Sequence, residues 1–181
     1  MEISHVEMMG KLLGADPPRA VCDFTTLHAD GDVGETGSLQ YASRDRWILD
    51  LDHAGRTLHT PEREEFTGLG GERHTADRPT TPSYTSAVAL LLPRYAAIYG
   101  RRGDDWSIDE TVPIRTGDGG SLQVVFQHRE DPRFRSTAHV HPTQYCITAF
   151  INPAETRKLT NLRFELTEEE EEQARRLLDA A

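Results

Sequence analysis

The sequence is organised around one apolar run near its middle. Residues 83–100, SYTSAVALLLPRYAAIYG, form the most apolar stretch of a chain of 181 residues. Ala87–Leu92 favours a helix, and Pro93 interrupts it because a proline in a helix interior removes a backbone hydrogen bond. Gly100 is expected to end the second piece, since glycine is common just past a helix end. The run therefore predicts a two-piece helical insert that covers, or plugs, a curved sheet.

The segments on either side of this insert have the pattern of β-meanders. Apolar and polar residues alternate in short segments that are separated by turns rich in Gly, Asp and Pro, as in antiparallel strands with one solvated face. The connections are too short for helical crossovers. Four or five strands precede the insert and about five follow it, and three helices cannot cover so many strands laid flat. The predicted fold class is therefore α+β, a curled antiparallel sheet in an unclosed half-barrel, with an N-terminal helix, a central helical lid and a short C-terminal helix.

A chain of this length is expected to form a single domain with one core. Both terminal helices begin with a capping box, Ser4 with Glu7 and Thr167 with Glu170. The stretch 68–82 lacks periodicity and is interpreted as a long loop. The expected parts are an N-terminal helix (1–18), a first meander (19–67), the loop and helical lid (68–103), a second meander (104–166) and a C-terminal helix (167–181).

Composition and charge narrow the function classes. The formal net charge of −10 argues against nucleic-acid binding, which requires a basic surface for phosphates. No apolar run approaches the ~18 residues that a membrane span requires. The first residues, MEISHVEMMGKLLGADPP, lack the regions of a signal peptide, so a cytoplasmic protein is expected. Cys22 and Cys146 are interpreted as reduced, half-buried thiols, with a disulfide between two strands left open.

The candidate ligand-binding residues are those expected on the inner face of the sheet. Glu110 falls on the otherwise apolar face of Trp106–Ile114, where a carboxylate could orient a ligand or act as a general base. The aromatic side chains that alternate inward either fill the core or line an apolar cavity. The candidates are Phe24, Tyr41, Trp47, Trp106, Glu110, Phe126 and Tyr145.

Three histidines are weak candidates for a metal site. His139 and His141 lie two apart on a predicted strand and so share a face, and His128 on the preceding strand could lie across from them. Three imidazoles suit zinc, or iron with a carboxylate. Half-exposed strand histidines without a metal are the more ordinary interpretation, so no cofactor is expected. No GxSxG nucleophile motif occurs, and no catalytic residue is assigned.

Three stretches carry a resemblance to a known family. They are GSLQYASRDRWILDLDHAGRTLHT, then LLLPRYAAIYG followed by a strand with Trp106, and finally LTNLRFEL. In these stretches and in the order of elements, the chain resembles the LolA/LolB-like lipoprotein-carrier superfamily, including its actinobacterial lipoprotein and sigma-factor-regulator relatives. The resemblance covers most of the chain at the level of pattern and transfers no functional residue. It implies an unclosed barrel around an apolar cavity that receives acyl chains or another apolar ligand, with the insert as lid.

The expected function is that of a non-enzymatic binding or carrier protein for a hydrophobic or amphipathic, lipid-like small molecule. One alternative is a small cavity-based isomerase, cyclase or hydrolase that uses His139, His141 or Glu110. Another is a protein-interaction module, with a protein partner or a second copy, which predicts a filled core. The acidic run Glu168–Glu172 is interpreted as the solvated start of the last helix, and a binding tail for a basic partner is its alternative.

Overall fold

The computed structural model describes residues 3–77, 81–82 and 86–179. Residues 78–80 of the expected long loop and residues 83–85 of the expected central insert lie outside the described residues, as do residues 1–2 and 180–181.

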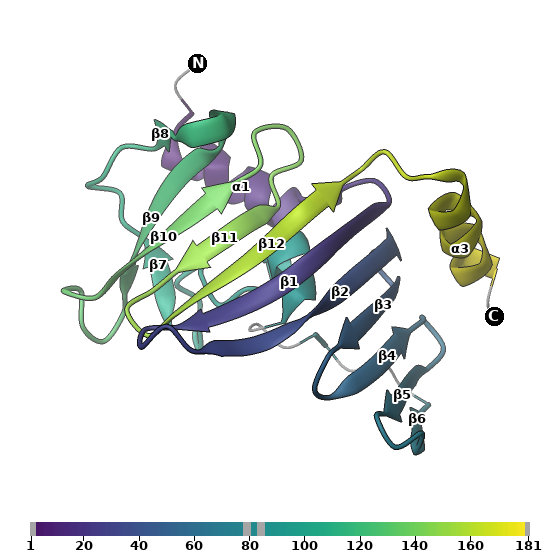
Figure 1. Ribbon diagram of the computed structural model, residues 1–181. Helices are drawn as coiled ribbons and strands as arrows, with labels where there is room; N and C mark the ends of the chain where they lie inside the picture. The colour runs from purple at the N-terminus through teal and green to yellow at the C-terminus, as the bar shows by residue number, and fades with distance from the viewer. Residues whose placement is uncertain (1–2, 78–80, 83–85, 180–181) are drawn as a thin grey trace.

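Within the described residues, one antiparallel sheet of twelve strands dominates the fold (Figure 1). Its order is β6-β5-β4-β3-β2-β1-β12-β11-β10-β9-β7, and β8 also pairs with β9. The two meanders meet where β1 pairs with β12, and the sheet stays open between β6 at one edge and β7 at the other. The strands are β1 Ala20–His28, β2 Val33–Ser43, β3 Arg46–Leu51, β4 Gly55–His59, β5 Glu64–Gly68, β6 Arg73–Ala76, β7 Trp106–Ile108, β8 Arg115–Thr116, β9 Leu122–His128, β10 Arg135–Val140, β11 Ile147–Ile151 and β12 Glu155–Arg163.

Helices cover both faces of this sheet. Two of them, α1 and α2, pack on the face that we call inner, behind the strands in Figure 1. The third, α3, packs on the opposite, outer face beside β2 and β3. The fold class is therefore α+β with an open antiparallel sheet, as the sequence predicts. The helices are α1 His5–Gly14, α2 Ala87–Leu91 and α3 Glu168–Asp179, with short 3-10 turns at Pro93–Tyr95 and Asp118–Gly120.

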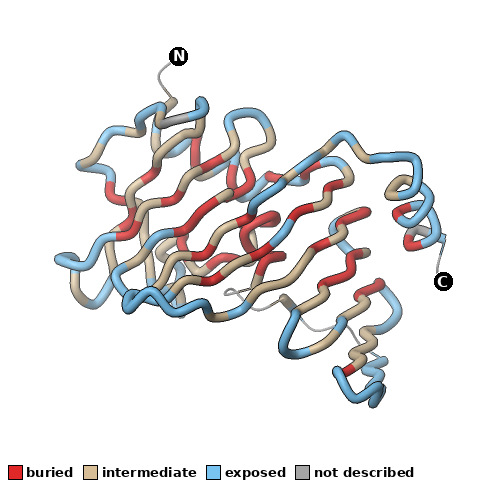
Figure 2. Tube along the Cα trace, viewed as in Figure 1, coloured by how far each residue is buried: buried red, intermediate tan, exposed pale blue. Residues whose placement is uncertain are grey.

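Strand alternation sorts the side chains between the two faces. In β1, Ala20, Cys22 and Phe24 are buried on the inner face, whereas Asp23 between them is exposed on the outer face. Successive strand residues point to opposite faces, so one alternating sequence supplies both surfaces. Figure 2 shows the result as buried positions concentrated in the central strands and in α2, with exposed positions towards β6.

The inner face is covered by α1 and α2, of which the sequence predicts only the central helix in this place. The hydroxyl Oγ of Ser4 accepts a hydrogen bond from the Glu7 amide at 3.2 Å, which caps α1. One turn apart on that helix, Met8 and Leu12 are both fully buried against the sheet. All five residues of α2 are at most 1% exposed. The central helix is thus a plug inside the fold, with no solvent-facing side.

Three predicted boundaries differ from the structure. The stretch 68–82, predicted as loop, contains the edge strand β6. The predicted strand through Ile114 ends as β7 at Ile108, because the chain turns at Asp109. The second piece of the central insert ends at Tyr95 as a single 3-10 turn, and Gly100 takes a positive φ of 69° after it. The interruption at Pro93 is where the sequence places it.

Candidate functional site

The interior beneath α2 holds almost no empty space. The hollow there measures about 20 Å³ and lies among Leu90, Ile98, Trp106 and Phe150. A hollow of roughly 10–15 Å³ by this measure holds one water molecule, so this one has room for about one water and not for a larger ligand. The inner face is therefore a packed core in this structure.

Four of the seven candidate ligand-binding residues belong to this core. Phe24, Tyr41, Trp47 and Phe126 are each at most 4% exposed on the inner face. The Tyr41 hydroxyl donates to Asp16 at 2.8 Å, and burial raises the pKa of this tyrosine. Ligand binding by these rings stays a prediction.

Two further aromatic candidates are half-buried. Trp106 contacts the rings of His128 and Phe150 edge-on, with centroids 5.1 and 6.1 Å away. Tyr145 has a positive φ of 55° in the turn before β11, and the Lys11 ammonium lies 5.0 Å from its ring centroid. Only Trp106 reaches the small hollow beneath α2.

The expectation that Glu110 lies on an apolar inner face is wrong. Glu110 is exposed, because β7 ends at Ile108 and the residue falls in the following turn. Its neighbour Asp109 is the buried acid, at 1% exposure. The Thr111 hydroxyl donates to Asp109 Oδ1 at 2.5 Å and lowers the pKa of that carboxyl, and the Arg135 guanidinium lies 3.1 Å from Oδ2. These contacts tie the loop after β7 to β10.

The three candidate histidines do not come together. In the pairing of β9 with its neighbours, His128 lies opposite Trp106, whereas His139 lies opposite Gln123 at the other end of β9. The His141 ring nitrogen Nδ1 accepts hydrogen bonds from the amides of the turn that follows, and burial lowers its pKa. Among the described residues, no group of three or more His, Cys, Asp and Glu side chains is placed to hold a metal ion.

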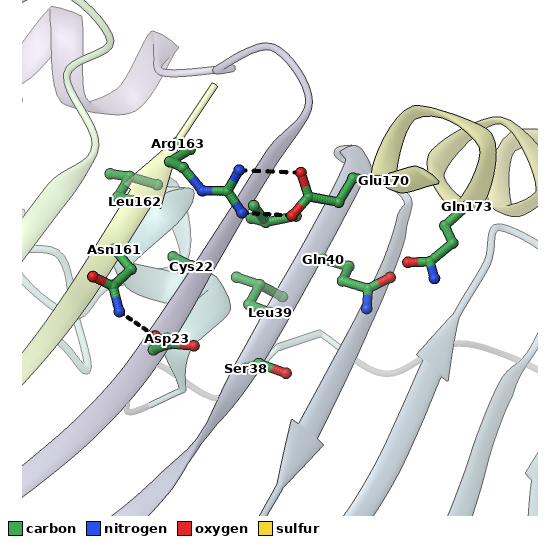
Figure 3. Close-up of a pocket in the computed structure, with 11 residues that line it drawn as sticks. Cys22, Asp23, Ser38, Leu39, Gln40, Asn161, Leu162, Arg163, Glu170 and Gln173 are labelled. Atoms are coloured by element: carbon green, nitrogen blue, oxygen red, sulfur yellow. Dashed lines mark hydrogen bonds and ion pairs between the residues drawn. The ribbon is translucent and has the colours of Figure 1, made fainter. Parts of the chain in front are cut away.

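A spacious hollow lies on the outer face, between β12, β1, β2 and α3. We call it the outer groove (Figure 3). It measures about 670 Å³, within the range of ligand-binding clefts. Its lining is mixed, with polar side chains at most positions. The lining side chains used below are Asp23, Ser38, Gln40, Asn161, Arg163, Glu170 and Gln173.

An ion pair spans the end of the outer groove between strand and helix. The Arg163 guanidinium of β12 donates two hydrogen bonds to the Glu170 carboxylate of α3, at 2.5 and 3.2 Å. This interaction lowers the pKa of Glu170 from 4.5 to about 2. Glu170 also accepts from the Thr167 amide at 2.8 Å, which completes the capping box predicted from the sequence.

The floor and wall of the outer groove present hydrogen-bonding groups with free capacity. Asn161, at a bulge of β12, donates to Asp23 Oδ2 at 2.6 Å. Within the described part of the chain, the side chains of Ser38, Gln40 and Gln173 make no hydrogen bond. Figure 3 shows Ser38 and Gln40 on the sheet and Gln173 on α3. A hydroxyl and two carboxamides supply both donors and acceptors to a ligand.

The groove exists because α3 packs on the sheet with only part of its length. Ala174 and Leu177 are buried against Ala42 and Ile48 of the outer face. Nearer its start the helix is held by ion pairs, with Glu170 to Arg163 and with Glu171 to Arg19. The sheet surface beside that first part of the helix is left open. The floor strands and α3 therefore bound a hollow that no other described element fills.

The sequence interpretation missed this site. The lining residues on the strands occupy solvated positions. The apolar pattern in these strands identifies only the alternate, inward-facing residues, which form the core. Asp23 and Asn161 are 138 residues apart, so no local spacing joins them. The only local signal is the Thr167–Glu170 capping box, which fixes the start of α3 but not the strand on which it packs.

Known proteins share little sequence with this chain. No protein-family model matches the chain, and no curated protein matches it. Among solved structures, the chain is similar to the crystal structure of MucB, with 13% sequence identity and a TM-score of 0.47. The match covers 91% of this chain and 60% of that one, so the chain spans about three fifths of the MucB chain. The structure itself has the predicted fold class, α+β with an unclosed antiparallel sheet, but in the part of the chain that it describes the hollow beneath α2 is only about 20 Å³. No helix among the described residues has the length and apolar character to cross a membrane.

Proposed function

We propose that the protein is a non-enzymatic interaction module that binds a segment of a partner protein in the outer groove. The observation that supports this is the contrast in free space. The hollow beneath α2 is about 20 Å³, whereas the groove offers about 670 Å³ lined by polar side chains with unused hydrogen-bonding capacity. A main chain presents an amide donor and a carbonyl acceptor at each residue, which suits carboxamide and hydroxyl side chains.

A hydrophobic or lipid-like ligand in the interior is the competing function. It requires α2 to leave the core. The helix buries Val88, Leu90 and Leu91 completely, or nearly so. Burial of each such side chain contributes roughly 1.5–3 kcal/mol, so displacing the three costs roughly 5–9 kcal/mol before the ligand gains anything. The groove requires no such rearrangement.

The experiment is a selection of random peptides of about 12 residues, displayed on their encoding nucleic acid, against the immobilised full chain. A parallel selection uses Ser38→Trp. Ser38 points outward from β2 into the groove, so an indole there fills the hollow while the core keeps its residues. Gln173→Trp narrows the groove from the α3 side and serves if the first variant does not fold.

We expect enrichment of a related set of peptides by the wild-type chain and its loss with the groove-filling variant. Absence of enrichment over the starting pool would contradict the proposal. So would enrichment that the tryptophan leaves unchanged. Titration with a fluorescent long-chain fatty acid tests the competing function, because stoichiometric uptake with displacement of α2 would favour an interior ligand.

A further inference from the structure

The charges around the outer groove are not balanced. Arg163 and Arg19, the basic side chains at the first part of α3, are each paired with a glutamate of that helix. Asp23 and Glu169 form no salt bridge within the described part of the chain, although Asp23 also lies in the electrostatic field of Arg163. Both arginines are therefore already paired with glutamates, whereas these two carboxylates are not paired.

Asp23 lines the groove, and Glu169 lies about one helical turn before Gln173, which also lines it. Asp23 of β1 lies directly opposite Ser38 in the β1–β2 pairing, on the floor of the groove. Its Oδ2 accepts from Asn161, which leaves Oδ1 available to a ligand. Glu169 is exposed four residues before Gln173, so both lie on the same side of α3. One acid thus lies on the floor and the other beside the wall.

We infer that the segment bound in the outer groove is basic and carries lysine or arginine side chains that meet Asp23 and Glu169. This rests on the proposed function and names the class of partner. Gln40, Ser38 and Gln173 bind the main chain of the segment, and the two carboxylates bind its cationic side chains. The net charge of −10 also steers a basic partner towards this protein and repels an acidic one.

The test uses the strongest peptide from the selection and two matched versions, in which all Lys and Arg are replaced by Gln or by Glu. Affinities are measured by calorimetry with the full chain at low and high salt. Spermidine provides the positive charge without a peptide backbone. The groove variant is Asp23→Asn with Glu169→Gln. The control, Glu35→Gln with Glu110→Gln, removes the same charge from exposed sites that do not line the groove.

We expect the basic peptide to bind at least about tenfold more tightly than its Gln version, the scale of a hydrogen bond to a charged group. The groove variant should remove most of that difference, and the control variant should keep it. Equal binding of the basic and Gln versions, still abolished by Ser38→Trp, would overturn the basic partner and leave the proposed function standing. Spermidine binding as tight as the peptide would overturn a peptide partner. Peptide binding that Ser38→Trp leaves unchanged would overturn both.

Discussion

The two faces of this sheet differ in how completely helices cover them. On the inner face, α1 and α2 fill the space over the strands, and Leu12, Leu91 and Phe126 are fully buried. On the outer face, α3 buries a small patch around Ala174 and Leu177 and is otherwise held by ion pairs. The first arrangement leaves a hollow of about 20 Å³ and the second leaves a groove of about 670 Å³. The comparison teaches that an open sheet can carry a spacious groove on the face that its main core does not use.

The reaction rates of the two cysteine thiols report whether the inner face is closed. Of the predictions made here, this one has the largest expected effect. Burial raises the pKa of both Cys22 and Cys146 from 9.0 to about 12. The thiolate is the reactive form, so the folded protein should react with a disulfide reagent at pH 8 about a thousandfold more slowly than the urea-unfolded chain. Spectrophotometric thiol titration measures both rates. Fast reaction of either thiol in the folded protein would show an interior that opens readily, and the comparison of the two faces would fail.

Truncating one leucine on each face compares how much each face contributes to the free energy of unfolding. Leu91→Ala leaves a cavity in the filled core and should lower the free energy of unfolding by about 2–5 kcal/mol. Leu177→Ala, in the small outer patch that can relax towards solvent, should cost at most about 2 kcal/mol. Urea unfolding followed by tryptophan fluorescence gives both values. Equal losses would mean that α3 is as integral to the fold as α2.

The same two variants should separate binding from stability. Leu177→Ala loosens the wall of the outer groove and should weaken the selected peptides, whereas Leu91→Ala should leave their affinity unchanged while the protein is folded. Weaker peptide binding by Leu91→Ala, with unchanged binding by Leu177→Ala, would instead indicate a ligand site in the interior.

The parts of the fold that the sequence predicts are those that depend on local pattern. Alternation in β1 places Cys22 and Phe24 inside without reference to the rest of the chain. A proline at position 93 interrupts the central helix for a purely local reason. The prediction that the same alternating strand continues through Glu110 was wrong. The chain turns at Asp109, which is held by hydrogen bonds from Thr111 and an ion pair with Arg135.

The outer groove depends on contacts that no local pattern encodes. It forms because β12 pairs with β1 and because α3 then crosses to β2 and β3. Ser38 and Gln40 are ordinary solvated strand residues until that helix stands beside them. The sequence did not predict the edge strand β6 for a similar reason. All four of its residues are exposed, so they show no apolar alternation, and the strand forms by pairing with β5.

The smallest expected effect concerns the ion pair that holds the start of α3. Arg163 lowers the pKa of Glu170 from its usual 4.5 to about 2, so the pair contributes stability above pH 4.5 that is lost as the pH falls towards 2. In Glu170→Gln the amide oxygen can still accept from the Thr167 amide, but the charge is gone. The stability difference between the wild type and this variant should therefore be largest well above pH 4.5 and should shrink steadily as the pH falls from 4.5 through 2. Urea midpoints across this range measure it, with Glu169→Gln as the matched substitution at a neighbouring glutamate outside the ion pair. A difference that persists unchanged near pH 2 would mean that α3 is held by its apolar patch alone, and that the outer face resembles the inner one more closely than the structure indicates.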